Sequence, residues 1–205
     1  MFTGIVQGVG QIVDIIDNDK LRTYQVKLPQ ALTANLTIGA SVANDGCCLT
    51  ITAFNGDVVT FDIMQETLAL TTLGDKRVGD LVNIERSAKY GDEIGGHVMS
   101  GHISGVAKIT NINKTATNCE MVLELPVKLV KYVLYKGFIG VDGASLTVGN
   151  IDNNCFSIHL IPETLSITTL SDKQVGDFVN IEIDSQTQAI VDTVERVLAQ
   201  KQLTQ

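Results

Sequence analysis

One segment of twenty residues occurs twice in this chain: it reads ETLALTTLGDKRVGDLVNIE at Glu66–Glu85 and ETLSITTLSDKQVGDFVNIE at Glu163–Glu182. Fifteen of the twenty positions are identical, and the two copies lie 97 residues apart. A period of about 100 residues is the size of a whole domain rather than of a solenoid repeat. The same offset, without a gap, relates Gly4-Ile5-Val6 to Gly101-His102-Ile103 and Asp45-Gly46 to Asp142-Gly143. The sequence therefore predicts two similar globular units in tandem, with two similar pockets.

The composition is that of a folded protein without a nucleic-acid or membrane partner. The 205 residues are 44% hydrophobic with only three prolines, enough for two ordinary cores. The net charge is −8 and the 15 basic residues are scattered, whereas nucleic-acid binders concentrate lysine and arginine. No apolar run approaches the ~18 to 20 residues of a membrane span, and the N-terminus lacks a signal-peptide pattern. We expect a cytoplasmic chain with free thiols at its four cysteines.

Short strands dominate the pattern within each copy. Residues Thr23–Leu28 alternate polar and apolar side chains, and Val58–Ile63 places Val59, Phe61 and Ile63 on one face. Turn residues such as Asn55-Gly56-Asp57 separate these runs, which leaves room for roughly six strands in each copy. Short strands at this spacing favour an all-β unit, either a small closed barrel or a sandwich, over alternating strands and helices.

The last 21 residues differ from both copies. Their apolar side chains recur with the spacing of one stripe on an amphipathic helix: Ile190, Val191, Val194, Val197 and Leu198. An isolated helix of this length is marginal in water, so the stripe needs a cover. Two interpretations stay open: packing against the chain's own barrel, and self-association.

The two copies differ where chemistry is concerned. Only the first copy has a thiol at the position of Cys48, and only the second has an imidazole after its leading glycine, so similar pockets can have different chemical roles. The matched pairs that differ are Cys48 and Ser145, Ile5 and His102, Ser41 and Phe138, and Asp62 and His159.

These side chains also have structural interpretations. A free cysteine is more often buried than reactive, which applies to Cys48. His97 and His102 are five residues apart, but His159 is the only other histidine and no carboxylate pattern accompanies them, so we expect no metal site. The glycines of this segment, Gly95, Gly96 and Gly101, match neither dinucleotide nor Walker patterns.

Four separated motifs resemble the riboflavin synthase family: Met1-Phe2-Thr3-Gly4-Ile5-Val6, Asn44-Asp45-Gly46-Cys47-Cys48-Leu49-Thr50, Gly95-Gly96-His97-Val98-Met99-Ser100-Gly101-His102, and Gly140-Val141-Asp142-Gly143-Ala144-Ser145-Leu146-Thr147. The resemblance runs nearly end to end. It implies an all-β fold of two tandem six-stranded Greek-key barrels, at residues 1–97 and 98–185. A C-terminal helix at 186–205 would help to assemble a homotrimer.

The resemblance also implies an activity, the last step of riboflavin biosynthesis. Two molecules of 6,7-dimethyl-8-ribityllumazine dismutate by transfer of a four-carbon unit, which gives riboflavin and 5-amino-6-ribitylaminouracil without cofactor or metal. In this family the donor and the acceptor bind to the N-terminal barrel of one chain and the C-terminal barrel of its neighbour. The alternative is a non-catalytic antenna protein of the same shape that binds lumazine or flavin.

Site residues follow from the resemblance position by position. Cys48 is similar to the thiol that assists addition to the lumazine in the N-terminal barrel, and His102 to a base or hydrogen-bonding partner in the C-terminal barrel. The other matches to catalytic positions are Asp142, Ser145, Asp184, Ser41 and His97. The substrate-binding matches are Gly4, Ile5, Val6, Cys48, Leu49, Thr50, Asp62, Ile63, Met64, Gln65, Glu66 and Thr67, with Gly101, His102, Ile103, Lys136, Ser145, Leu146, Thr147, His159, Leu160, Ile161, Pro162, Glu163 and Thr164.

Overall fold

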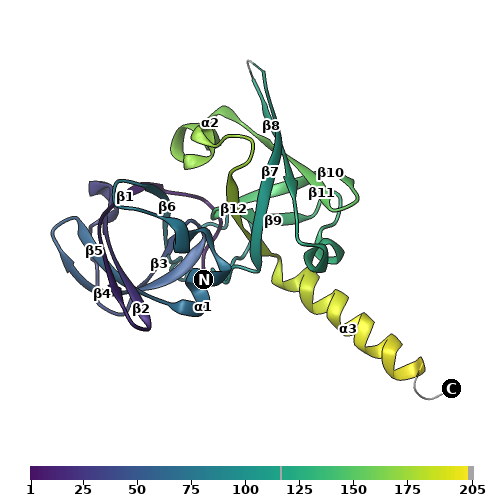
Figure 1. Cartoon of the computed structure of the whole chain (residues 1–205), viewed down its shortest axis with the longest axis horizontal. Helices are drawn as coiled ribbons and strands as arrows, with labels where there is room; N and C mark the ends of the chain where they lie inside the picture. Colours follow the sequence, from purple (N-terminus) through teal and green to yellow (C-terminus); the bar gives the residue numbers. More distant parts are fainter. Residues whose placement is uncertain (116, 203–205) are drawn as a thin grey trace.

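The computed structural model describes residues 1–115 and 117–202, so the end of the expected tail, residues 203–205, lies outside the described residues. Two closed antiparallel barrels follow one another along the chain (Figure 1). The first contains β1 (Gly8–Asn18), β2 (Leu21–Lys27), β3 (Ser41–Asn44), β4 (Cys47–Asn55), β5 (Val58–Met64) and β6 (Leu81–Arg86). The second contains β7 (Gly105–Lys114), β8 (Cys119–Glu124), β9 (Phe138–Val141), β10 (Ala144–Asp152), β11 (Cys155–Leu160) and β12 (Phe178–Ile183).

Both barrels have Greek-key topology. The first is closed in the order β1-β2-β5-β4-β3-β6, so the hairpin-connected strands β3, β4 and β5 are followed by β6, which returns to lie beside β3. In the second barrel β12 lies beside β9 in the same way. The predicted six-stranded barrels are confirmed, and the sandwich alternative is excluded because closure leaves no open sheet edge.

Short helices interrupt the barrels at matched positions. They are α1 (Gln65–Leu70) and α2 (Pro162–Ile167), with 3-10 turns η1 (Gln30–Leu32), η2 (Thr72–Asp75), η3 (Val127–Tyr132) and η4 (Thr169–Asp172). The sequence analysis did not predict α1 and α2, because six residues are too few for a visible helical period. The side chain of Thr71 accepts from the backbone N–H of Leu73, which starts η2 directly after α1.

Each barrel has its own core, but each core takes one residue from the other half of the chain. Tyr24 and Phe61 are fully buried in the first barrel, and Phe156 in the second. Val6, which precedes the first barrel, packs in the second core. Ile103, which precedes the second barrel, packs in the first. The leading segments 1–7 and 98–104 therefore cross between the barrels, and the division at residue 97 does not describe them.

Reciprocal hydrogen bonds join the barrels. The side-chain amide of Asn83 donates to the backbone oxygen of Asp142, and that of Asn180 donates to the backbone oxygen of Asp45, each at 2.9 Å. The amide oxygens of both asparagines accept from backbone N–H groups at η2 and η4 of the opposite half. Asn83 and Asn180 occupy matched positions in the recurring segment, so the strongest internal repeat of the sequence supplies residues of the inter-barrel interface.

Each half of the chain has a buried ion pair at this interface, formed by the aspartate whose backbone oxygen accepts the asparagine bond. Lys76 Nζ lies 2.9 Å from Asp45 Oδ2, and Lys173 Nζ lies 3.1 Å from Asp142 Oδ2. Both aspartates have no exposed side-chain surface, and both lysines are 14% exposed. The same aspartates accept from the backbone N–H groups of Asn83 and Asn180. Charge and hydrogen bonding thus repeat on both sides of a pseudo-twofold axis.

The backbones of the two barrels approach each other at the matched glycines Gly46 and Gly143. A Cβ atom added to Gly46 would lie 2.7 Å from the backbone nitrogen of Gly143, and Gly46 has φ +80°. Glycine at this position is required both by the contact and by the left-handed backbone.

The C-terminal helix α3 (Ser185–Gln202) begins at the end of β12 and extends away from both barrels (Figure 1). Asp184 caps it by accepting from the backbone N–H and hydroxyl of Thr187. Lys131 of η3 pairs with Asp192 and Glu195 on its side. The apolar stripe stays exposed, with Ile190 at 65% and Leu198 at 55%, so the chain's own barrel does not cover it. Within the described residues no helix is long and apolar enough to cross a membrane.

Candidate functional site

A small cavity in the first barrel brings a thiol and an imidazole together. Its volume is about 180 Å³, and its lining defines what we call the Cys48 pocket: Cys47, Cys48, Glu66, Thr67, Leu70, Thr71, Gly101, His102 and Ile103. Side chains alternate along β4, so Cys47 faces the core while Cys48 is only half-buried. Burial raises the pKa of Cys47 to about 12, which keeps that thiol protonated. Cys48 is therefore the accessible thiol of the pair.

His102 reaches this pocket on the crossing segment 98–104. The backbone N–H of Cys48 donates to the carbonyl oxygen of Gly101 at 2.8 Å. Gly101 has φ +82°, and a Cβ atom there would lie 2.5 Å from the Cβ of Cys48. We expected His102 to serve the second barrel. It lines a pocket of the first barrel instead, because the segment that carries it pairs with β4.

The mirror arrangement occurs in the second barrel, around a group of residues that we call the Ser145 site: Gly4, His97, Phe138 and Ser145. The backbone N–H of Ser145 donates to the carbonyl oxygen of Gly4 at 2.8 Å. His97 Nδ1 lies 2.7 Å from Ser145 Oγ, and its ring stacks on Phe138 with 5.1 Å between ring centroids. We expected Gly4–Val6 to line the first barrel's pocket, but this segment serves the second barrel.

Burial keeps His97 neutral. It lowers the pKa of the imidazole, although the nearby carboxylate of Asp184 opposes the shift. Burial alone would raise the pKa of Asp184, but hydrogen bonds from Thr187 hold it below its ordinary value. His97 Nε2 is buried without a hydrogen-bond partner among the described residues. A neutral imidazole bonded to a hydroxyl can accept a proton from it, so this pair has the composition of an acid/base site.

Asp142 and Ser41, both expected as catalytic residues, lie elsewhere. Asp142 is completely buried in the inter-barrel interface, where its partners are Lys173 and Asn180. Burial raises the pKa of Asp142 to about 6, although Lys173 opposes the shift. Ser41 lies on β3 opposite Thr50, in the hydrogen-bonded ladder with β4.

The expected substrate-binding residues fall into two groups. Leu49, Ile63, Leu146 and Leu160 face the barrel cores, as alternation along β4, β5, β10 and β11 requires. The others lie in the Cys48 pocket, in the crossing segments, or at more exposed positions of the strands and short helices: Thr50, Asp62, Met64, Gln65, Thr147, His159, Ile161, Pro162, Glu163 and Thr164.

Two exposed residues have partners outside both sites. Asp62 accepts from the hydroxyl of Thr23. His159 Nε2 lies 3.7 Å from Glu120 Oε1.

Lys136 has an unusual backbone. Its φ is +65°, a left-handed conformation that disfavours side chains, and the matched residue of the first repeat is Gly39, with φ +87°. The Lys136 amino group lies 5.3 Å from the ring centroid of Tyr135. Lys136 therefore places a cation at a loop of the second barrel. The matched loop of the first barrel has Gly39 and no cation at this position.

Sequence reasoning missed several residues of these sites. Leu70 and Thr71 line the Cys48 pocket but lie just beyond the expected binding segment. Glu85 and Glu182 hold the two crossing segments, with Oε1 of each accepting a backbone N–H at 2.6 Å. Both glutamates end the recurring segment, so the repeat itself was the signal.

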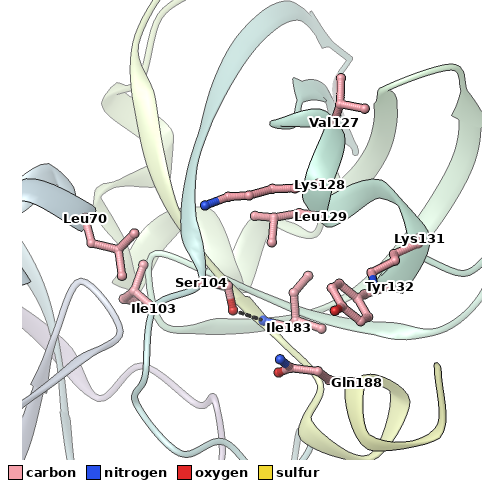
Figure 2. Close-up of a pocket in the computed structure, with 10 residues that line it drawn as sticks. All are labelled: Leu70, Ile103, Ser104, Val127, Lys128, Leu129, Lys131, Tyr132, Ile183 and Gln188. Atoms are coloured by element: carbon pink, nitrogen blue, oxygen red, sulfur yellow. Dashed lines mark hydrogen bonds between the residues drawn. The ribbon is translucent and has the colours of Figure 1, made fainter. Parts of the chain in front are cut away.

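A larger cavity of about 660 Å³ adjoins the Cys48 pocket and shares Leu70 and Ile103 with it. Figure 2 shows Ser104 and Ile183 joined by a hydrogen bond on one side and Lys128 alongside Leu129 on the other. Its lining contains neither a thiol nor an imidazole. The groups suited to covalent and proton-transfer chemistry are therefore in the Cys48 pocket and the Ser145 site.

These features define a class of protein: a duplicated β-barrel with two candidate sites of similar architecture and different reactive groups. Comparisons with known proteins identify it further. The model of the lumazine binding domain matches the chain twice, over residues 3–87 and 100–184. The riboflavin synthase of Escherichia coli (strain K12) is 55% identical over 203 residues, which cover 98% of this chain and 95% of the relative. The riboflavin synthase of Chlamydia pneumoniae is 45% identical, with 97% and 98% covered.

Solved structures agree with this result. The crystal structure of LumP complexed with 6,7-dimethyl-8-(1'-D-ribityl) lumazine has a TM-score of 0.82 and 30% identity. That of LumP complexed with riboflavin has a TM-score of 0.83 and 33% identity. Each covers 90% of this chain and 100% of the solved chain. The chain belongs to the lumazine-binding family and, by its relatives, to the riboflavin synthases.

Proposed function

We propose that this chain catalyses the dismutation of two molecules of 6,7-dimethyl-8-ribityllumazine to riboflavin and 5-amino-6-ribitylaminouracil. A four-carbon unit passes from one lumazine to the other, so the enzyme is a transferase that holds two copies of one substrate. The observation that carries the proposal is the pair of sites related by the pseudo-twofold axis. One site contains Cys48 and His102, and the other contains Ser145 and His97. The identity to riboflavin synthases over almost the whole chain supports it.

Positioning is the largest physical contribution to this reaction. Two identical heterocycles must meet in one orientation, and holding both reactants can lower a barrier by about 7 to 11 kcal/mol. Two sites of common architecture bind the common parts of the two molecules alike. The residues that differ between the sites then act on the rings in different ways.

The side chains divide the chemistry between two ligands. Cys48 adds to, or assists addition at, the lumazine in its pocket, and His102 exchanges a proton with the same molecule. At the other site the neutral His97 takes a proton through Ser145, whose Oγ lies 2.7 Å away. Asp184 keeps a negative charge near His97. Asp142 acts through the inter-barrel interface, by holding the strand that carries Ser145.

We further propose a cytoplasmic homotrimer in which the N-terminal barrel of one chain faces the C-terminal barrel of the next. The exposed apolar stripe of α3 supports self-association, because the described part of the chain leaves Ile190, Val194 and Leu198 uncovered. No cofactor, metal, nucleic acid or membrane enters the reaction.

The alternative function is a non-catalytic antenna protein. The LumP structures, whose titles name lumazine and riboflavin as ligands, support it through their fold. The reactive side chains in both sites of this chain favour catalysis.

The deciding experiment mixes the purified protein with the lumazine alone and follows flavin absorbance. Two lumazines consumed per riboflavin formed supports the enzyme, and a bound but unchanged lumazine supports the antenna. Cys48→Ser and His102→Gln should each lower turnover while ligand binding is largely retained. Cys155→Ser is the matched control, since Cys155 is also half-buried but lies outside both sites. Loss of binding with unchanged turnover per bound complex would refute these two roles.

A further inference from the structure

The crossing segment that brings His102 to the first barrel is held by a carboxylate of the second barrel. Glu182, on β12 of the second barrel, accepts from the backbone N–H of Ser100 at 2.6 Å, from the Ser100 hydroxyl at 2.8 Å and from the backbone N–H of Gly101 at 3.1 Å. The Ser100 hydroxyl in turn accepts from the backbone N–H of His102. One buried side chain therefore fixes three consecutive residues.

Glu85 repeats this arrangement for the other site. On β6 of the first barrel, it accepts from the backbone N–H of Thr3 at 2.6 Å, from the Thr3 hydroxyl at 2.8 Å and from the backbone N–H of Gly4 at 3.1 Å. Each glutamate is 3% exposed. The hydrogen bond from each crossing segment to the reactive residue is also repeated. The carbonyl oxygen of Gly101 accepts from the backbone N–H of Cys48, and that of Gly4 accepts from the backbone N–H of Ser145, at 2.8 Å in both cases.

Burial of an ionisable group needs a physical reason. Burial raises the pKa of Glu182, and the hydrogen bonds from Ser100 and Gly101 together with the charge of His102 oppose the shift. A carboxylate has two acceptor oxygens and no donor, which matches three converging donors. A buried ionic group is weak support for stability as such, and its best-attested use is to specify one conformation.

We propose that Glu182 is the positioning residue of the Cys48 pocket and that Glu85 is the positioning residue of the Ser145 site. Each glutamate acts across the interface: the second barrel sets the place of His102 beside Cys48, and the first barrel sets the place of Gly4 beside Ser145. The consequence for turnover rests on the proposed function, but the placement of His102 does not.

Substitution of either glutamate by glutamine gives the sharpest test. In Glu182→Gln the amide oxygen can still accept from Ser100, but an NH₂ group replaces Oε2, which accepts from the backbone N–H of Gly101 at 3.1 Å, so two donors face each other there and we expect the segment to shift. Misplacement by about 1 Å can cost about 10²-fold in rate, so we expect Glu182→Gln to lower kcat by about 10- to 100-fold. Glu85→Gln is the matched variant for the other site.

The decisive measurement is independent of turnover. The chain has three histidines, so the NMR signals of His102 can be assigned by their loss in His102→Gln and compared between variants at one pH. Glu182→Gln should shift the imidazole and backbone amide signals of His102 and speed the alkylation of Cys48 by iodoacetamide, while the His97 signal stays in place. Glu85→Gln should leave the His102 signals and Cys48 alkylation as in the wild-type chain.

Circular dichroism checks that each variant is folded. Two outcomes in folded protein would overturn the proposal: unchanged His102 signals in Glu182→Gln, or equal effects of both variants on His102. If Glu182→Gln does not fold, Ser100→Ala removes only the hydroxyl links and should give a smaller shift of His102 in the folded chain. No shift there would also refute the proposal. A wild-type chain that binds lumazine without forming riboflavin would refute the proposed function and leave the NMR result standing.

Discussion

Replacing Lys173 with methionine tests the inter-barrel interface directly. The variant removes the amino group 3.1 Å from Asp142 Oδ2 and its hydrogen bond to the backbone oxygen of Phe178 at 2.9 Å. Asp142 has no exposed surface and cannot reach water. Leaving one partner of a buried ion pair alone costs about 3 to 5 kcal/mol. For a chain of this size that corresponds to a fall in Tm of roughly 6 to 20 °C.

The loss should depend on pH in a defined direction. Burial already raises the pKa of Asp142 to about 6 from its ordinary 3.8, and loss of Lys173 removes a group that lowers it. As the pH falls through the folded-state pKa, folded Asp142 binds a proton that the unfolded chain does not yet bind. The free energy of unfolding therefore increases as the pH falls from above the folded-state pKa of Asp142 toward its pKa in the unfolded chain. This gain in stability is larger in Lys173→Met. The difference in the free energy of unfolding between the variant and the wild-type chain should therefore be smaller at pH 5 than at pH 7.

Urea unfolding at these two pH values, followed by circular dichroism, measures both effects. Lys76→Met at the mirror position, where Lys76 lies 2.9 Å from Asp45, should give a loss of similar size. Lys128→Met is the control for lysine removal, because Lys128 is exposed and surface substitutions usually change stability by less than about 0.5 kcal/mol. A Lys173→Met chain as stable as the wild type at pH 7, or a loss that widens at pH 5, would refute the reasoning.

Three further predictions concern the axis, the second site and the tail. Gly46→Ala should cost about 2 to 5 kcal/mol in unfolding experiments, since it combines a left-handed backbone with a clash against Gly143, whereas Gly56→Ala, with φ +62° and open space around it, should cost only about 1 to 2 kcal/mol. Ser145→Ala should lower turnover by about 10²-fold with Cys48 alkylation unchanged; unaltered turnover would exclude proton transfer through this hydroxyl. Removal of the chain from Ser185 onward should yield monomers of low activity in sedimentation and rate assays, and a fully active monomer would contradict a site shared between chains.

The sequence pattern was sufficient to predict two all-β units and the inequality of their pockets, and the family resemblance added the choice of a barrel over a sandwich. The 97-residue offset defined two units, alternation along the Val58–Ile63 run indicated a strand with one buried face, and turn residues separated the strands. The structure confirms six strands per barrel. The short helices α1 and α2 were missed because one and a half turns leave no periodic signal.

The placement of His102 could not be predicted, for a reason of symmetry. Both repeats carry a leading glycine and a matched strand, so pairing within a barrel and pairing across the two barrels satisfy the same motifs. The contacts that decide between these two pairings are backbone hydrogen bonds, such as that from the Cys48 N–H to the Gly101 oxygen. Backbone bonds of this kind do not require particular side chains, so the sequence does not show them. The positioning glutamates Glu85 and Glu182 were visible as a match but indistinguishable from fold-maintaining residues for the same reason.

The side chains that hold the two barrels together are not the reactive side chains of the two sites. The side-chain hydrogen bonds that connect the two halves come from asparagines that are identical in both repeats. Identical aspartate–lysine pairs and glutamates hold the backbone on each side of these bonds. Cys48 and Ser145 contribute only their backbone N–H groups to these links, and His102 and Ile5 contribute no side-chain bond to them. Their side chains can therefore differ without altering the barrels or the crossing segments. This separation allows one architecture to present a thiol with an imidazole to one ligand and a hydroxyl with an imidazole to the other, which a reaction between two identical molecules requires.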